Sequence, residues 1–170
     1  MKFKTINPAT GKVMKEYATM TSAEALKSAE QVKNAFPAWK KLTIKERAGF
    51  LRKLASALRS KKEEYARIMT LEMGKPIKQA LAEVEKCAWT AEIYADDGEQ
   101  WLKEEIVQGD GKQHTITFSP LGCILLIMPW NFPFWQAFRC AIPAMLAGNV
   151  ALLRHSNVCP ESALVIEKIF

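Results

Sequence analysis

One short segment, residues 129–133, combines residue types that could take part in chemistry. The sequence Pro129-Trp130-Asn131-Phe132-Pro133 follows an apolar run and precedes a predicted helix. In an open α/β sheet, the loop after a strand faces the free N–H groups of the next helix, and ligands bind there. The side-chain amide of Asn131 could donate a hydrogen bond to a developing negative charge. Local sequence alone favours a simpler interpretation, in which Asn131 caps the helix that begins near Pro133.

The cysteines offer no comparable pattern. Cys87, Cys123, Cys140 and Cys159 are widely spaced, and the chain has only two histidines, which excludes a zinc site of the usual spacing. Cys123 falls in a predicted strand and Cys140 in a predicted helix, with no base evident nearby. We therefore expect all four cysteines to be small buried hydrophobic residues rather than nucleophiles, and we expect no metal site.

Length and composition limit the class of protein. The chain has 170 residues, 49% hydrophobic and 25% charged, which fits one globular domain or one domain with an appendage. Its longest apolar run, residues 123–130, is far shorter than the ~20 residues of a membrane-spanning helix, and residues 1–4 do not open an apolar signal core. We expect neither a membrane protein nor a secreted one, and predict a soluble chain in the cytoplasm.

The net charge of +6 does not indicate a nucleic-acid partner. The basic excess lies in the first 60 residues, where the cations are spread among helical positions rather than gathered beside aromatic residues. They include Lys27, Lys33, Lys40, Lys45, Arg52 and Arg59. We expect them to form a solvated helix face.

The first hundred residues are expected to be mostly helical after a short hairpin. The hairpin pairs residues 2–6 with residues 12–18 around the turn Asn7-Pro8-Ala9-Thr10-Gly11. Capping boxes at Thr21–Glu24 and Thr43–Glu46 each open an amphipathic helix, and Pro37 is expected to end the first of them. A third helix over 62–73 precedes Gly74-Lys75-Pro76, after which a fourth carries an apolar stripe of Ile77, Leu81, Val84, Ala88, Ala91 and Ala95.

The remaining residues predict a β-ribbon followed by a βαβ unit. The ribbon, around residues 104–120, has one polar face and no core of its own, so we expect it to pack on another subunit or, alternatively, to lie back on its own domain. Residues 122–128 read as a strand buried on both faces, residues 133–146 as a helix and residues 150–153 as a second buried strand. A last helix begins at Pro160, with an apolar side of Ala163, Leu164 and Ile166. Because a two-stranded parallel sheet buries too little to stand alone, we expect the front part of a larger α/β domain.

Several motifs together resemble the aldehyde dehydrogenase superfamily over essentially all 170 residues. They are Pro129–Pro133, Ala147-Gly148-Asn149, the strand ending in Arg154, the turn Asn7–Gly11, Ala38-Trp39 and Glu72-Met73-Gly74-Lys75-Pro76-Ile77. Residues 128–133 and Leu153-Arg154-His155 are most similar to the succinate-semialdehyde dehydrogenase type. The resemblance implies a helical part over 1–103 and a ribbon over 104–120 that joins subunits of a dimer or tetramer. It also implies the first βαβ part of a Rossmann-like NAD(P)-binding domain over 121–170.

In this family a cysteine attacks an aldehyde, hydride passes to NAD or NADP, and a glutamate activates the water that releases the carboxylate. Both groups would lie beyond residue 170, with the rest of the catalytic domain. The 170 residues alone are therefore expected to be inactive unless a C-terminal catalytic fragment accompanies them. The alternative is a non-catalytic interaction module derived from the family.

The resemblance also assigns roles to single residues. Asn131 would be the oxyanion donor, and Ile127, Met128, Pro129 and Trp130 would line the cofactor. Arg154 replaces the usual lysine at the adenosine ribose, and Asn157 stands where a glutamate is common, so NADP would be tolerated or preferred. Arg139, with Trp135, would bind the distal carboxylate of the substrate, although a surface position or a salt bridge to another helix would explain Arg139 equally well.

Overall fold

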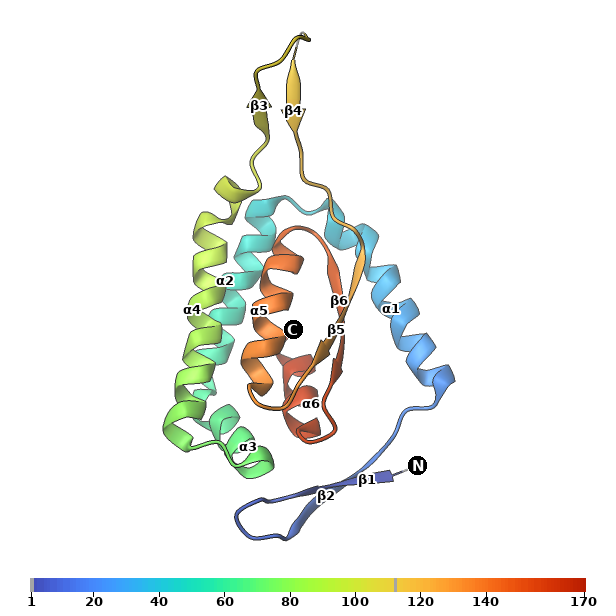
Figure 1. Cartoon of the computed structure of the whole chain (residues 1–170), viewed down its shortest axis with the longest axis vertical. Helices are drawn as coiled ribbons and strands as arrows, with labels where there is room; N and C mark the ends of the chain where they lie inside the picture. The colour runs from blue at the N-terminus through green and yellow to red at the C-terminus, as the bar shows by residue number, and fades with distance from the viewer. Residues whose placement is uncertain (1, 112) are drawn as a thin grey trace.

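The computed structural model describes residues 2–111 and 113–170, and its elements form a mixed α/β fold (Figure 1). The elements, in chain order, are the hairpin β1 (Lys2–Ile6) and β2 (Val13–Ala18), the helices α1 (Ser22–Lys41), α2 (Ile44–Ser60), α3 (Lys62–Met73) and α4 (Ile77–Trp101), the ribbon β3 (Glu105–Val107) and β4 (His114–Ile116), the unit β5 (Cys123–Met128), α5 (Pro133–Leu146) and β6 (Val150–His155), and α6 (Pro160–Ile169). The predicted order of hairpin, helices, ribbon and βαβ unit is confirmed.

Both capping boxes form as the sequence predicts. At the start of α1 the Thr21 hydroxyl accepts from the Glu24 N–H at 3.2 Å, and the Glu24 carboxylate accepts from the Thr21 N–H at 2.7 Å. The Thr43 and Glu46 pair repeats this arrangement at α2. At the end of α3, Gly74 adopts a left-handed conformation with φ 76°, which costs glycine little and a residue with a Cβ more.

The prediction that Pro37 ends the first helix is wrong, because α1 continues to Lys41. A proline inside a helix removes one backbone hydrogen bond. The last turn is held instead by Trp39, whose indole N–H donates to the Met145 carbonyl at 2.9 Å and whose ring lies 5.4 Å from that of Phe50. Met145 lies 106 positions from Trp39, so the local pattern could not reveal this contact.

The core lies where α4 packs against α2, α3 and α5. The two helices α4 and α5 approach closely at Gly98, where a Cβ would lie 2.1 Å from Leu146 Cδ2. Small residues on α4 permit this approach, and Ala80, Ala88 and Ala91 are fully buried. The other large buried side chains are Leu58, Met69, Val84, Phe134, Phe138 and Ile142.

The parallel sheet of β5 and β6 is covered on one face and open on the other. Leu126 is 6% exposed on the side of α5, whereas Leu125 is 57% and Ile127 66% exposed. The prediction that β5 is buried on both faces is therefore wrong for the described residues. Cys123, on the open face, is exposed and Cys140 is half-buried, which also corrects the expectation that all cysteines are buried. On α6 the buried apolar residues include Val165 and Ile166, while Leu164 is exposed.

The ribbon of β3 and β4 extends away from the helices (Figure 1). It is antiparallel, with Ile106 opposite Thr115, and every residue of both strands is exposed. Ile106 is 76% and Phe118 55% exposed. The predicted ribbon is thus confirmed as a structural element.

The N-terminal hairpin is held against α6 by one carboxylate. Glu161 Oε2 accepts from the Tyr17 hydroxyl at 2.7 Å and from Lys15 Nζ at 2.8 Å. These two bonds lower the pKa of Glu161 below its ordinary value of 4.5. The ionised carboxylate therefore supports docking of the hairpin.

We expect docking of this hairpin to weaken as the pH falls below 4.5. The pKa of Glu161 is lowered in the folded chain, so its contribution is fully present above the unfolded pKa and is lost as the pH falls through the folded one. The chemical shifts of Tyr17, followed by NMR across this range, measure the change. Glu161→Gln should abolish the transition, and an unchanged titration in that variant would assign it to another group.

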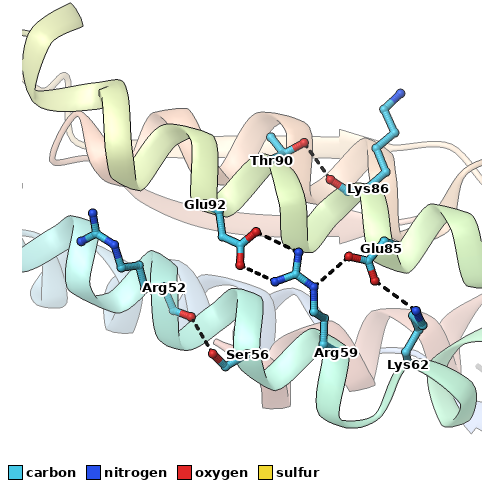
Figure 2. A network of polar contacts seen from close by, with 8 residues as sticks. All are labelled: Arg52, Ser56, Arg59, Lys62, Glu85, Lys86, Thr90 and Glu92. Carbon is cyan, nitrogen blue, oxygen red and sulfur yellow. Dashed lines mark hydrogen bonds and ion pairs between the residues drawn. The ribbon is translucent and has the colours of Figure 1, made fainter.

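Two arginines of α2, Arg52 and Arg59, form ion pairs with α4, and Figure 2 shows the pairs of Arg59. Arg59 forms a two-point pair with Glu92 and also donates to Glu85, at 2.8 Å. Arg52 Nη2 lies 2.8 Å from Asp96 Oδ1.

Within the described residues, no helix is long and apolar enough to cross a membrane.

Candidate functional site

Asn131 lies in the loop between β5 and α5, and its side chain does not cap the helix. The N-cap residue of α5 is Phe132, which makes no side-chain cap. Asn131 is exposed, and among the described residues only its backbone carbonyl accepts a hydrogen bond. The simpler interpretation of Asn131 as a helix cap is therefore wrong, and its amide is available to a ligand.

The N-terminus of α5 is capped instead by Glu83, a residue of α4. Glu83 Oε1 accepts from the backbone N–H groups of Phe134 and Trp135, both at 2.9 Å. A carboxylate at this end also complements the helix dipole. The first N–H groups of α5 are thus not free, and the site is not the anion-binding helix terminus that the loop position suggested.

Lys75 connects this carboxylate to the Asn131 loop. Its ammonium forms an ion pair with Glu83 Oε2, donates to the Asn131 carbonyl at 3.1 Å and lies 3.7 Å from the centre of the Phe132 ring. Lys75 is 5% and Glu83 4% exposed. A buried pair of this kind is tolerated because each charge is both paired and hydrogen-bonded.

A third buried side chain, His155 at the end of β6, holds the loop at Pro133. His155 Nε2 lies 2.9 Å from the Pro133 carbonyl, and Nδ1 accepts from the Ser156 N–H at 2.8 Å. Because a backbone N–H can only donate, the proton resides on Nε2, which donates to Pro133. Burial lowers the pKa of His155, in keeping with a neutral ring.

The neighbouring Cys159 resembles a nucleophile beside a base but lacks the required electrostatics. Its Sγ lies 3.4 Å from His155 Nδ1, where the thiol donates. Burial and nearby carboxylates raise the pKa of Cys159 to about 12, and burial also raises that of Cys87. Neither thiol is activated, which agrees with the prediction that they are structural.

The candidate cofactor residues gather at the carboxyl end of the sheet. Ile127 pairs with Arg154 across the two strands, and both side chains are exposed on the open face. Met128, half-buried, points to the other face beside His155. Pro129, Trp130 and Asn157 are exposed in the loops that follow the two strands.

The candidate substrate residues lie together on α5, and α4 adds a cation that sequence reasoning missed. Trp135 is half-buried, with Lys86 Nζ 3.9 Å and Arg139 Cζ 6.0 Å from the ring centroid. Both cations are exposed, and neither forms an ion pair with the described residues. Of the alternatives considered for Arg139, a salt bridge to another helix is thus excluded within that part of the chain.

Glu83 and Lys75 were also missed as members of the site. Glu83 occupies a position on the apolar stripe of α4, between Ala80 and Cys87, and a carboxylate on a buried face is the signal that could have revealed it. Glu72 has the same role at α6, where it accepts from the N–H groups of Glu161 and Ser162 at 2.6 and 2.9 Å. No three potential metal-binding side chains come together among residues 2–111 and 113–170.

Comparison with known proteins identifies close relatives by sequence. The aldehyde dehydrogenase family pattern matches residues 1–170. A probable succinate-semialdehyde dehydrogenase [NADP(+)] of Synechocystis sp. is 45% identical over 170 residues, which is all of this chain and 37% of that protein. The succinate semialdehyde dehydrogenase [NAD(P)+] Sad of Escherichia coli K12 is 43% identical over 97% of this chain and 36% of that protein.

Solved structures agree with the sequence relatives. The succinic semialdehyde dehydrogenase of Streptococcus pyogenes, determined with NADP+, superimposes with a TM-score of 0.93 at 33% identity, over 98% of this chain and 37% of that one. The present chain therefore spans little more than a third of the length of these relatives. With the family pattern matching its whole length, the chain is a member of the aldehyde dehydrogenase family.

Proposed function

We propose that this chain is the N-terminal part of an NAD(P)-dependent dehydrogenase that oxidises succinate semialdehyde, or a similar aldehyde, to a carboxylate. One observation carries the proposal: Asn131 keeps its side-chain amide free after β5 because Glu83 caps α5 in its place. A free donor at this position suits the oxygen that becomes negative when a nucleophile attacks an aldehyde. Names of the relatives in Synechocystis sp. and E. coli support the same substrate class.

The open end of the sheet fits a dinucleotide. Ile127 offers an exposed apolar side chain, and beside it Arg154 offers an exposed cation for a ribose or its phosphate. Met128, Pro129 and Trp130 would complete the wall of the cofactor site, and Asn157 would lie near the ribose. The bound nicotinamide would accept the hydride of the aldehyde.

Arg154 is expected to favour NADP over NAD. Arg154→Leu should raise the KM for NADP about 10–100-fold, because a hydrogen bond to a charged phosphate contributes roughly 1.5–3 kcal/mol. The KM for NAD should change little, since that cofactor lacks the phosphate. Steady-state kinetics of the whole enzyme with both cofactors measure the difference, and Arg67→Leu, an exposed arginine of α3, serves as control. Equal changes for both cofactors would contradict the role.

Arg139 is expected to select anionic aldehydes. Its guanidinium and the Lys86 ammonium flank Trp135, four residues beyond Asn131 along the chain, and no described carboxylate neutralises them. Arg139→Met should raise the KM for succinate semialdehyde about 10–100-fold and affect an uncharged aldehyde of similar length far less. Lys86→Met should act in the same direction with a smaller effect. A uniform loss with both substrates would count against an anion-binding role.

The remaining parts follow from the same proposal. Residues 1–103 and 121–170 belong to the cofactor-binding domain, and the ribbon over 104–120 joins subunits of a dimer or tetramer through its exposed apolar residues. The enzyme acts on a small aldehyde in the cytoplasm. Its catalytic cysteine and glutamate are supplied by polypeptide that follows these residues or accompanies them.

The direct test is to assay the whole enzyme and residues 1–170 in parallel. We expect NADPH formation with succinate semialdehyde from the whole enzyme and none from the 170 residues alone, because the catalytic cysteine and glutamate of this proposal belong to other polypeptide. Intact-mass and native mass spectrometry establish which polypeptides each sample contains. Absence of aldehyde oxidation by the whole enzyme would favour a non-catalytic interaction module instead.

A further inference from the structure

We infer that the buried Lys75–Glu83 ion pair is a positioning device that aims the Asn131 amide at the reacting oxygen. The inference rests on the proposed function and extends it to two residues outside the reacting centre. Neither residue is placed in contact with substrate or cofactor. Each acts through the backbone of the loop that carries Asn131.

The two residues of the ion pair hydrogen-bond to the loop backbone on both sides of Phe132. Lys75 holds the carbonyl of Asn131 at 3.1 Å, and Glu83 holds the N–H groups of Phe134 and Trp135 at 2.9 Å. The Asn131–Phe132 peptide group is thus fixed on one side of Phe132 and the N–H groups of Phe134 and Trp135 on the other, so the direction in which the Asn131 side chain leaves the backbone is restricted as well. Asn131 has no side-chain hydrogen bond of its own among the described residues, so this direction depends on the backbone contacts.

Burial of the ion pair keeps the loop contacts of Lys75 and Glu83 in place. Lys75 and Glu83 are 5% and 4% exposed. Water therefore cannot replace either partner of the ion pair unless the structure around the pair opens first. The two charges come from the turn before α4 and from α4 itself, whose rigid helix sets where both side chains begin. A catalytic group must be held within about 0.5 Å of its productive position by just such supporting contacts.

Substitution of Lys75 should therefore lower turnover without weakening substrate binding. Misplacing a reacting group by about 1 Å can cost about 10²-fold in rate, so Lys75→Met should lower kcat by about 10²-fold with KM changed by less than about threefold. Lys75→Arg retains a cation and a donor and should recover most of the loss. A general structural defect would instead lower the amount of active enzyme and would not distinguish methionine from arginine in this way.

The chain supplies a matched control in Glu72. This carboxylate is also buried and caps the helix after a parallel strand, α6, but within the described residues it accepts no hydrogen bond from the Asn131 loop. Glu72→Gln and Glu83→Gln make the same chemical change at equivalent helix ends. We expect kcat to fall about 10²-fold for Glu83→Gln only.

A double-mutant cycle decides whether Lys75 acts through Asn131. In an Asn131→Ala background the amide is already absent, so Lys75→Met should cost less than about threefold in kcat, compared with about 10²-fold in the parent enzyme. Full additivity of the two losses would overturn the inference.

Hydrogen exchange separates this inference from the proposed function. In the whole enzyme, Glu83→Gln should speed amide exchange in residues 129–137, and Glu72→Gln only in residues 160–166. If the parent enzyme oxidises no aldehyde, the proposed function fails. If Glu83→Gln leaves amide exchange in residues 129–137 unchanged, the ion pair does not position the Asn131 loop, whatever the activity of the enzyme.

Discussion

Replacing Asn131 with alanine in the whole enzyme is expected to lower kcat by about 10²–10³-fold. Loss of one donor to a developing oxyanion typically costs this much, because the donor is worth more in the transition state than in the bound aldehyde. KM for the aldehyde should change little for the same reason. The measurement is steady-state kinetics with succinate semialdehyde, supported by the rate of the first turnover.

The design of this experiment excludes a loss of folding as the cause. The Asn131 side chain makes no hydrogen bond to the described residues and is exposed, so its removal should leave the melting temperature nearly unchanged. Asn34→Ala, the same change at an exposed position of α1, provides the control. A kcat within about threefold of the parent would remove Asn131 from the catalytic machinery, since an oxyanion donor accounts for far more.

Helix boundaries were predictable wherever a local signal determines them. The capping boxes at Thr21 and Thr43 use donors and acceptors three residues apart, and Gly74 satisfies a conformation required at a single position. Gly74 likewise marked the end of α3 at Met73, and Pro133, a residue type favoured in the first turn of a helix, marked the start of α5. In each case the residue types that mark the boundary lie within one turn of it.

The errors arise where a distant partner decides the local structure. Helix α1 passes through Pro37 because Trp39 docks on Met145, more than a hundred residues away. The uniformly apolar sequence of β5 predicted a strand buried on both faces. In the structure of the described residues, however, the Ile127 side chain on that strand is 66% exposed. An apolar run indicates what a strand can bury, and only the neighbouring elements determine what it does bury.

The same distinction divides the candidate site. The type and place of Asn131 marked its loop from sequence, whereas its supporting residues Lys75 and Glu83 lie 56 and 48 positions earlier, and no local rule connects them. The position of this loop, after a strand and before α5, had also suggested that the N-terminus of α5 could bind an anion. Glu83 overturns that argument, because it fills the terminus itself and leaves the amide of Asn131 as the free donor.

Replacing Phe138 with alanine is expected to cost about 3–5 kcal/mol of unfolding free energy, the largest stability loss that we predict. Phe138 is fully buried on α5, and its ring stacks on those of Phe134 and Phe170, with centroids 5.9 and 5.2 Å apart. Truncation would remove transfer free energy and leave a cavity between α5 and α6. Because domains are stable by only about 5–15 kcal/mol, a large share of the total would be lost.

Urea unfolding of the 170-residue chain, followed by circular dichroism, measures this loss. Phe50→Ala is the matched control, since Phe50 is 49% exposed and its truncation should cost less than about 1 kcal/mol. Helix α5 carries Phe138 on its buried face and begins directly after the Asn131 loop, so the same helix links the core to the site. A midpoint shift no larger than that of Phe50→Ala would show that α5 is not anchored through Phe138, and the position of the loop would then depend on its polar contacts with Glu83, Lys75 and His155.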